Sequence, residues 1–251
     1  MTGNPQDKVV LITGAARRIG AAIAQKFHEQ EYNVLIHCKD SLEEADRLAI
    51  LLNQKREGSA LALQADLTRE DQVARLADQA VQAFNRLDVL INNASSFYPT
   101  PLGEVTAAHW NYLLDSNLRG AFFLSQALAG ALGTQRGAII NLLDIYAEQP
   151  LHDYPVYSIA KAGLQAMTRS LAVELAPEVR VNGVAPGAIL WSKQEKDTNA
   201  EPRHESILAS IPLGRTGNTQ DIAEAVFFLA AEASYITGEV LRVDGGRRLN
   251  L

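Results

Sequence analysis

Short apolar runs rich in β-branched residues alternate along this chain with longer segments in which apolar residues recur every three or four positions. This alternation is typical of repeated βαβ units around a parallel sheet. The predicted strands are Val9–Thr13, Asn33–His37, Ala60–Gln64, Val89–Asn92, Ala138–Leu143, Arg180–Val184 and Glu239–Val243. The predicted helices are Ile19–Glu29, Leu42–Arg56, Glu70–Phe84, Ala107–Leu132, Val156–Leu175 and Gln220–Ala231. We therefore expect an α/β fold with a doubly wound, Rossmann-type parallel sheet.

No repeat, low-complexity tract or linker divides the 251 residues, and one α/β domain of this length is common, so we expect a single domain over 1–251. Leu190–Ser210 is the segment without a clear predicted element. It is charged and irregular, and it follows Pro186-Gly187 beyond a predicted strand end. Ligands of open α/β sheets bind beyond the carboxyl ends of the strands, so we expect a substrate lid here. Local composition fits a solvated surface loop equally well.

Composition argues against several classes of partner. The formal net charge is −6, and no block of Lys or Arg offsets it, which disfavours nucleic acid. The single cysteine, Cys38, cannot form an internal disulfide, and we expect it to be buried. Met1–Lys8 is polar, and no apolar run is long enough to cross a bilayer. We therefore expect a cytoplasmic protein without a membrane partner, and we predict no metal site.

A glycine-containing turn joins the first predicted strand to the first predicted helix. It reads Gly14-Ala15-Ala16-Arg17-Arg18-Ile19-Gly20. Gly14 permits a tight turn, Gly20 permits close helix packing, and the backbone N–H groups at the helix start can receive a pyrophosphate. The glycines alone are a weak indication, but their place in the first βα unit is the one that dinucleotide binding requires. Arg17 and Arg18 can pair with phosphate oxygens.

The end of the second predicted strand indicates which dinucleotide binds. Cofactors that lack the 2′-phosphate usually meet an acidic residue there, whereas this strand ends His37-Cys38-Lys39. Lys39 and Ser41 are expected beside the adenosine ribose, which favours NADPH. Asp40 is a contrary observation, because an inward carboxylate would oppose the phosphate. A solvated Lys39-Asp40 pair opening the next helix is the alternative.

Candidate proton-transfer residues follow the later strands. Asp144 comes after the fifth strand, and Tyr157 and Lys161 stand four apart, on one face of a helix. The ammonium of Lys161 is expected to lower the pKa of Tyr157, which would make its hydroxyl a proton donor or acceptor near neutral pH. Taken alone, this spacing also fits an ordinary surface pair.

Seven ordered motifs together make the chain resemble the short-chain dehydrogenase/reductase family over nearly its whole length. They are Thr13-Gly14 to Gly20, Asp66-Leu67, Asn92-Asn93-Ala94, Ser116-Asn117, Tyr157 with Lys161, Pro186-Gly187, and Thr237-Gly238 with Asp244-Gly245-Gly246. The resemblance implies that Tyr157 transfers the proton, that Lys161 binds the nicotinamide ribose, and that Asn117 supports a water and the active-site helix. It implies cofactor contacts from Gly14, Arg17, Arg18, Ile19, Gly20, His37, Lys39, Ser41, Asp66, Leu67, Asn93, Ala94, Ser95, Tyr157, Lys161, Pro186, Gly187 and Ile189.

The family usually carries serine thirteen residues before the tyrosine, where this chain has Asp144. With Arg18 in place of the middle glycine, the stretch 92–102 (NNASSFYPTPL) and Gln149-Pro150-Leu151, this departure resembles the pteridine reductase subgroup. The resemblance implies a pterin stacked between the nicotinamide and Phe97, with contacts from Arg18, Ser95, Phe97, Asp144 and Tyr157. An aromatic ring at a strand end can supply such a flat wall, with core packing as its alternative role.

The expected reaction is hydride transfer from NADPH to a carbon of a pterin C=N bond, with Asp144 or Tyr157 delivering a proton to the nitrogen. The substrate would be a dihydropterin, a biopterin or dihydrofolate. Asp144 would need a raised pKa, which a dry pocket provides. The alternatives are a carbonyl reductase acting on a 3-oxoacyl thioester or keto-sugar, and a regulatory protein that senses NADPH without turnover. Resemblance also implies a homotetramer joined through Ala107–Leu132 and Val156–Leu175.

Overall fold

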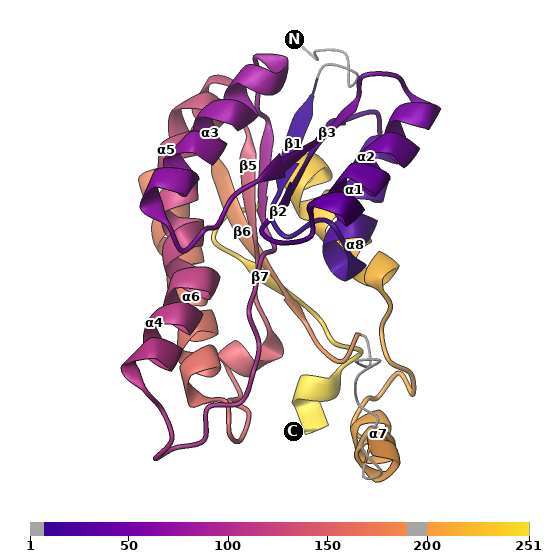
Figure 1. The fold of residues 1–251 in the computed structure, drawn as a ribbon. Helices are drawn as coiled ribbons and strands as arrows, with labels where there is room; N and C mark the ends of the chain where they lie inside the picture. The colour runs from indigo at the N-terminus through magenta and orange to yellow at the C-terminus, as the bar shows by residue number, and fades with distance from the viewer. Residues whose placement is uncertain (1–7, 190–199, 251) are drawn as a thin grey trace.

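The computed structural model describes residues 8–189 and 200–250. Within these ranges the strands form one seven-stranded parallel sheet in the order β3-β2-β1-β4-β5-β6-β7 (Figure 1). The strands are β1 (Val9–Ile12), β2 (Asn33–Cys38), β3 (Ala60–Gln64), β4 (Val89–Asn92), β5 (Ala138–Leu142), β6 (Arg180–Pro186) and β7 (Val240–Val243). The predicted Rossmann-type fold is confirmed, and the strand order reverses between β1 and β4. Parallel sheets of this kind bind ligands at that switch point.

The centre of the sheet is apolar on both faces because both faces carry helices. Every residue of β1, β4 and β5 is buried. In the register, Leu11 lies between Leu35 and Leu90, and this row packs on one face. Successive side chains of a strand alternate between faces, so the next residue, Ile12, packs into the apolar core on the opposite face of the sheet.

Helices cover the two faces in separate layers (Figure 1). One layer contains α1 (Arg18–Glu29), α2 (Leu42–Lys55) and α8 (Thr219–Phe227). The opposite layer contains α3 (Glu70–Phe84), α4 (Ala107–Leu114), α5 (Gly120–Thr134) and α6 (Pro155–Glu174). The chain crosses from one layer to the other at the middle of the sheet, which leaves the carboxyl ends of β1 and β4 open between the layers.

The helix predicted as Ala107–Leu132 is two helices separated by a π-helical turn, Asp115–Arg119. The N–H of Gly120 donates to the carbonyl oxygen of Asp115, five residues back. The side chain of Asn117 donates to the carbonyl oxygen of Leu113 at 3.0 Å. Such π-turns cluster at functional sites, and apolar periodicity does not reveal them.

The helix predicted as Gln220–Ala231 is also interrupted, because α8 ends at Phe227 and a π-turn, Phe228–Glu232, follows. The guanidinium of Arg180 donates to carbonyl oxygens of this turn, including those of Leu229 (2.7 Å) and Ala230 (2.7 Å). Helix-end carbonyls need such partners. This partner comes from about fifty residues earlier in the chain, so a local pattern could not predict it.

The segment predicted to lack regular structure, Leu190–Ser210, contains a helix, α7 (Ala200–Ala209), so that prediction is wrong for its second half. Few apolar residues recur at helical spacing in α7, which is why the sequence did not indicate it. The first half of the predicted lid, 190–199, lies outside the described residues. Two short 3₁₀ turns, η3 (Ile145–Ala147) and η5 (Arg247–Asn250), were not predicted either. None of the described helices is both long and apolar enough to span a membrane.

Candidate active site

A cavity of about 530 Å³ opens at the carboxyl ends of the central strands. It is lined by the predicted residues Gly14, Arg17, Arg18, Ile19, Gly20, His37, Lys39, Asp66, Leu67, Asn93, Ala94, Ser95, Phe97, Asp144, Tyr157, Lys161, Pro186, Gly187 and Ile189. Thr68, Ser96, Tyr112, Ser116, Leu142 and Leu143 also line it and were not predicted as site residues. Ser41 and Asn117 do not line it. The structure therefore brings segments from the whole chain to one place.

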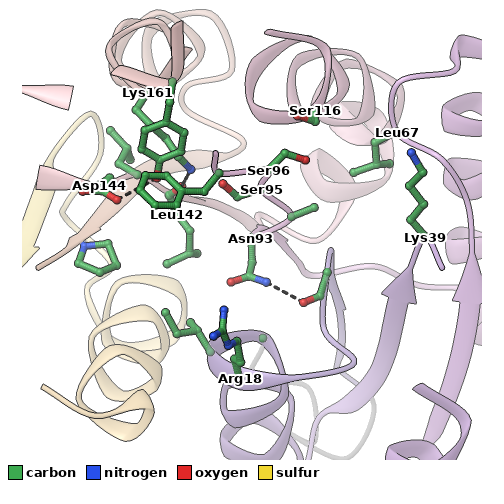
Figure 2. A pocket seen from close by; sticks show the side chains of 18 of the residues that line it. Arg18, Lys39, Leu67, Asn93, Ser95, Ser96, Ser116, Leu142, Asp144 and Lys161 are labelled. Carbon is green, nitrogen blue, oxygen red and sulfur yellow. Dashed lines mark hydrogen bonds between the residues drawn. The ribbon is translucent and has the colours of Figure 1, made fainter. Parts of the chain in front are cut away.

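The cavity is elongated. Figure 2 shows Asp144 and Lys161 toward one end and Lys39 toward the other, with Arg18 and Asn93 between them. Asn93 fixes the middle, because its side-chain amide donates to the carbonyl oxygens of Thr13 (2.8 Å) and Gly14 (2.9 Å). A long cavity across a topological switch point has the shape that a dinucleotide needs.

The turn between β1 and α1 leaves no room for side chains at its glycines. A Cβ on Gly14, whose φ is +61°, would lie 2.9 Å from Cα of Ala94. A Cβ on Gly20 would lie 2.4 Å from the carbonyl oxygen of Gly14. Backbone therefore approaches backbone closely here, and an alanine at either position must displace it.

Arg18 occupies a left-handed backbone conformation, with φ of +54°, which non-glycine residues rarely adopt. Such a conformation costs on the order of 1 kcal/mol and persists where the surroundings require it. It places an exposed guanidinium on the cavity wall (Figure 2). Within the described residues, no carboxylate lies within ion-pair distance of this guanidinium. Arg18 is therefore a cation available to an anionic ligand.

His37 holds the phosphate turn in place. Its Nδ1 accepts the N–H of Gly14 at 3.2 Å, so Nε2 carries the proton and donates to the carbonyl oxygen of Ala65 at 3.0 Å. Burial lowers the pKa of His37 to about 4, and the ring is neutral at physiological pH. The ring thus fixes the turn against β2 and β3 and consumes the Gly14 N–H, although it also lines the cavity.

Two of the predicted phosphate ligands have carboxylate partners. Arg17 forms an ion pair with Glu44. The Nζ atom of Lys39 lies 3.0 Å from Oδ2 of Asp66 and 5.3 Å from the ring centroid of Tyr112. An anion at either place must compete with these partners.

The two other residues weighed for the ribose end lie away from the cavity. Asp40 is exposed and does not line it, so the contrary carboxylate does not point inward. Ser41 precedes α2, makes no side-chain cap hydrogen bond and lies outside the lining. Its contact with the cofactor ribose stays a prediction.

Three predicted proton-transfer residues meet at the other end of the cavity. The hydroxyl of Tyr157 donates to Oδ2 of Asp144 at 2.8 Å, and Oδ1 of Asp144 accepts the backbone N–H of Tyr146 at 3.0 Å. Lys161 is fully buried and donates from Nζ to the carbonyl oxygen of Leu142 at 2.9 Å. The helix α6 supplies the tyrosine and lysine one turn apart, and the end of β5 supplies the aspartate.

Burial is the main cause of the pKa shifts of Asp144, Tyr157 and Lys161. It raises the pKa of Asp144 and lowers the pKa of Lys161 to about 8. Burial and then the Asp144 carboxylate raise the pKa of Tyr157 well above its usual value. The prediction that Lys161 lowers the pKa of Tyr157 is therefore wrong for this arrangement, because the ammonium bonds Leu142 and the carboxylate contacts the phenol. Tyr157 is a protonated hydrogen-bond donor.

Asn117 lies beneath the cavity, buried in the π-turn. Its Oδ1 accepts the hydroxyl of Ser95 at 2.6 Å, and its Nδ2 donates to the carbonyl oxygen of Ser96 at 3.0 Å. It therefore fixes the loop after β4 to the helix layer and acts as a positioning residue.

Phe97 is not a core residue, because 53% of it is exposed. Its ring stacks on Tyr154, with centroids 4.5 Å apart and planes 12° apart, and it meets the Tyr157 ring edge-on at 4.8 Å. One face of Phe97 is thus backed by another ring while the residue lines the cavity. This is a flat apolar wall beside the proton-transfer group.

Comparison with known proteins agrees with this geometry. The family model described as enoyl-(acyl carrier protein) reductase, of the short-chain dehydrogenase/reductase type, matches residues 14–248. This chain belongs to the short-chain dehydrogenase/reductase family. Proteins of this family use NAD or NADP, and the chain is an oxidoreductase of the family.

Curated relatives of this family member carry two kinds of activity in their names. Pteridine reductase 1 of Leishmania tarentolae is 36% identical over 99% of both chains. A 3-oxoacyl-(acyl-carrier-protein) reductase of Staphylococcus aureus is 37% identical over 95% of this chain and 97% of its own. A putative ketoacyl reductase of granaticin polyketide synthesis from Streptomyces violaceoruber is 35% identical over 99% of both. Overall identity does not choose between these substrates, so the choice depends on the site.

Proposed function

We propose that this chain is an NADPH-dependent pteridine reductase that reduces a C=N bond of a dihydropterin or dihydrofolate to the tetrahydro form. The observation that carries the proposal is the buried hydrogen bond between Asp144 and Tyr157. The family resemblance puts serine at the place of this aspartate. A carboxyl group is a chemically different partner for a substrate, because it can lose, accept or share a proton in the range where a serine hydroxyl cannot.

Reduction of a ring C=N bond requires a proton at the nitrogen next to the reduced carbon. Tyr157 keeps its proton because its pKa is raised, and the raised pKa of Asp144 brings that carboxyl closer to neutral pH. The two groups share a hydrogen bond, so they can pass one proton between them and onto the substrate. Reduction of a carbonyl also needs a proton at the oxygen, but Tyr157 could supply that proton alone, so a hydroxyl in place of Asp144 would only have to hold the carbonyl oxygen by a hydrogen bond.

The flat wall formed by the Phe97 ring favours a flat heterocyclic substrate. Stacking of a flat base on an aromatic side chain is worth about 1–3 kcal/mol. Phe97 is rigidly placed, since Tyr154 stacks on one face and the edge of Tyr157 contacts it. Ser95, bonded to Asn117, adds a polar group beside this wall.

The other end of the cavity fits the cofactor. At Gly14 and Gly20 the backbone leaves no room for a Cβ, so a phosphate could approach the main chain closely there. The guanidinium of Arg18 has no ion pair in the described part of the chain. Lys39 stands at the end of β2, where NAD-specific sites usually carry an acidic residue. Arg18, Arg17 and Lys39 would hold the phosphates. When bound, NADPH supplies the hydride.

Exposed apolar side chains on the helix layer of α4, α5 and α6 support a further part of the proposal, that copies of this chain associate as a tetramer. Trp110, Phe122, Ile159 and Val173 are each exposed by more than a third. Burying such side chains between copies is favourable. Sedimentation of the purified protein measures this directly.

The test of the proposed function is NADPH oxidation with three substrates: a dihydropterin, dihydrofolate and an acetoacetyl thioester. We expect kcat/KM to be highest for a pterin compound. Faster reduction of the thioester would assign the chain to carbonyl reduction, and binding of NADPH without oxidation by any substrate would indicate a sensor. Lys161→Ala serves as the inactive control in each assay.

A further inference from the structure

The C-terminal turn η5 is fixed to the end of β7 by one carboxylate. Oδ1 of Asp244 accepts the N–H of Gly246 at 2.9 Å, and Oδ2 accepts the N–H of Arg248 at 2.8 Å. The two glycines of this segment adopt positive φ, which lets the chain reverse immediately after the strand. The turn is therefore held in a defined place although it lies near the chain end.

This turn joins two segments that are far apart in sequence. On one side, Arg248 donates to Glu148 at 3.0 Å and its carbonyl oxygen accepts from Gln149 at 3.2 Å, so η5 is tied to the segment just after Asp144. On the other side, Asn250 donates to the carbonyl oxygen of Ser210 at 3.3 Å, directly after α7. Figure 1 shows the C-terminus beside α7.

Arg247 is the buried member of η5, with 7% of its surface exposed. Its Nη1 donates to the hydroxyl of Tyr146 at 3.4 Å and its Nε to the hydroxyl of Ser210 at 3.3 Å. Among the described residues, no carboxylate lies within ion-pair distance of this guanidinium. A buried charge without an ion pair is costly and calls for an explanation.

Tyr146 connects this buried cation to the active site. Its hydroxyl accepts from Arg247, and its backbone N–H donates to Oδ1 of Asp144. Tyr146 thus bridges the guanidinium of Arg247 and the carboxylate that accepts the hydrogen bond of Tyr157. We propose that Arg247 is a positioning residue of the active site, whose buried charge favours the ionised form of Asp144 and whose bonds tie the Asp144 segment to the end of α7.

The charged and titratable groups around Asp144 come from three elements. Tyr157 and Lys161 face it from α6, Tyr146 from η3 and Arg247 from η5. Burial raises the pKa of Asp144, while the hydrogen bonds of Tyr146 and Tyr157 and the charges of Lys161 and Arg247 lower it. Arg247 is the one of these cations that lies outside the predicted catalytic set, and it arrives from the opposite end of the chain.

The inference deepens the proposed function but is tested without turnover, by NMR titration of isotope-labelled aspartate carboxyl carbons in the full chain. Asp144→Asn assigns the Asp144 signal. We expect Arg247→Gln to move the midpoint of this signal to higher pH. Arg247→Lys keeps a cation and should lie nearer the wild type. Arg248→Gln is the matched control from the same turn, and Tyr146→Phe removes the hydroxyl contact while keeping the charge; neither should move the midpoint by more than Arg247→Lys.

An unchanged Asp144 midpoint in Arg247→Gln overturns the inference. Should that variant fail to fold, Arg247→Met, which keeps the apolar stem packed, decides by the same midpoint. The pH profile of kcat/KM for the pterin should shift in the same direction. If no pterin is reduced but the midpoint moves, the proposed function fails and the role of Arg247 stands.

Discussion

The phenol of Tyr157, in the first turn of α6, donates a 2.8 Å hydrogen bond to the carboxylate of Asp144, which lies thirteen positions earlier, just after β5. Burial and this carboxylate both keep the phenol protonated. We therefore expect Tyr157→Phe to lower kcat with a dihydropterin by about 10²-fold or more, the usual scale for a general acid–base group. The dissociation constant of NADPH, measured by fluorescence titration, should change little. Wild-type turnover in Tyr157→Phe would show that the proton takes another route.

A second prediction separates acid chemistry from hydrogen bonding at position 144. Asp144→Ser restores the residue that the family commonly carries, and we expect pterin reduction to fall by about 10²-fold while thioester reduction does not fall. Asp144→Asn is the matched control, because it keeps the shape but not the proton chemistry. If Asn supports pterin reduction as well as Asp does, the carboxyl acts only as a hydrogen-bond partner. Rates with both substrates on the two variants decide this.

A third prediction concerns Phe97. Removing a stacking wall worth about 1–3 kcal/mol should raise the pterin KM roughly 5- to 150-fold in Phe97→Ala, with NADPH affinity nearly unchanged. The melting temperature should fall little, because Phe97 is half exposed. Phe27→Ala is the contrasting control, since Phe27 is fully buried and its truncation should cost about 3–5 kcal/mol of stability. A large loss of stability in Phe97→Ala with unaltered pterin kinetics would return Phe97 to a packing role.

The sequence was sufficient for the sheet and for most of the cavity because both depend on local rules. Apolar β-branched runs such as Val9–Ile12 pack at the centre of a parallel sheet, and loops after such strands meet at one edge. Phe97 and Asp144 therefore converge as the resemblance implied, although they lie in separate loops.

The remaining features depend on contacts between distant segments. Arg180 binds the carbonyl oxygens of the π-turn after α8 from about fifty residues away, and Arg247 reaches Tyr146 across about one hundred residues. The predicted direction of the Tyr157 pKa shift was wrong for a similar reason, because that pKa depends on side-chain contacts that the sequence does not show. Spacing alone placed Lys161 one turn away, but it could not show that the ammonium bonds the carbonyl oxygen of Leu142.

The fourth prediction concerns cofactor choice. Arg17 and Lys39 pair with Glu44 and Asp66 in this structure, and a 2′-phosphate would replace those partners. Replacing both cations by alanine should weaken NADPH roughly 10- to 100-fold and NADH far less, as expected for charged hydrogen bonds to phosphate. Arg47→Ala is the control, because Arg47 also contacts Glu44 yet does not line the cavity. Equal weakening of both cofactors would contradict the assignment of NADPH.

The last prediction follows from His37, whose neutral ring accepts the N–H of Gly14 and holds the phosphate turn. Its pKa is about 4 in the folded chain and 6.5 as a free side chain, so below pH 6.5 the unfolded chain binds a proton that the folded chain refuses. The stability contributed by the neutral ring is thus complete above pH 6.5 and is lost as the pH falls toward 4. The full difference corresponds to about 3 kcal/mol.

Chemical denaturation at a series of pH values between 7 and 4 measures this loss, and the comparison is between slopes rather than absolute stabilities. His37→Gln keeps a side chain able to accept and donate hydrogen bonds but cannot titrate, so its free energy of unfolding should decline less steeply over this range than that of the wild type. Carboxylates contribute equally to both profiles and cancel in the difference. His28→Gln is the control for a second buried histidine, whose ring forms a hydrogen bond with Ser59 and does not line the cavity. NADPH affinity of the folded protein should fall only as the pH approaches 4, where His37 of the folded chain gains a proton and can no longer accept the Gly14 N–H, and only in the wild type and His28→Gln. Parallel slopes for His37→Gln and the wild type would show that His37 charges without opening the turn.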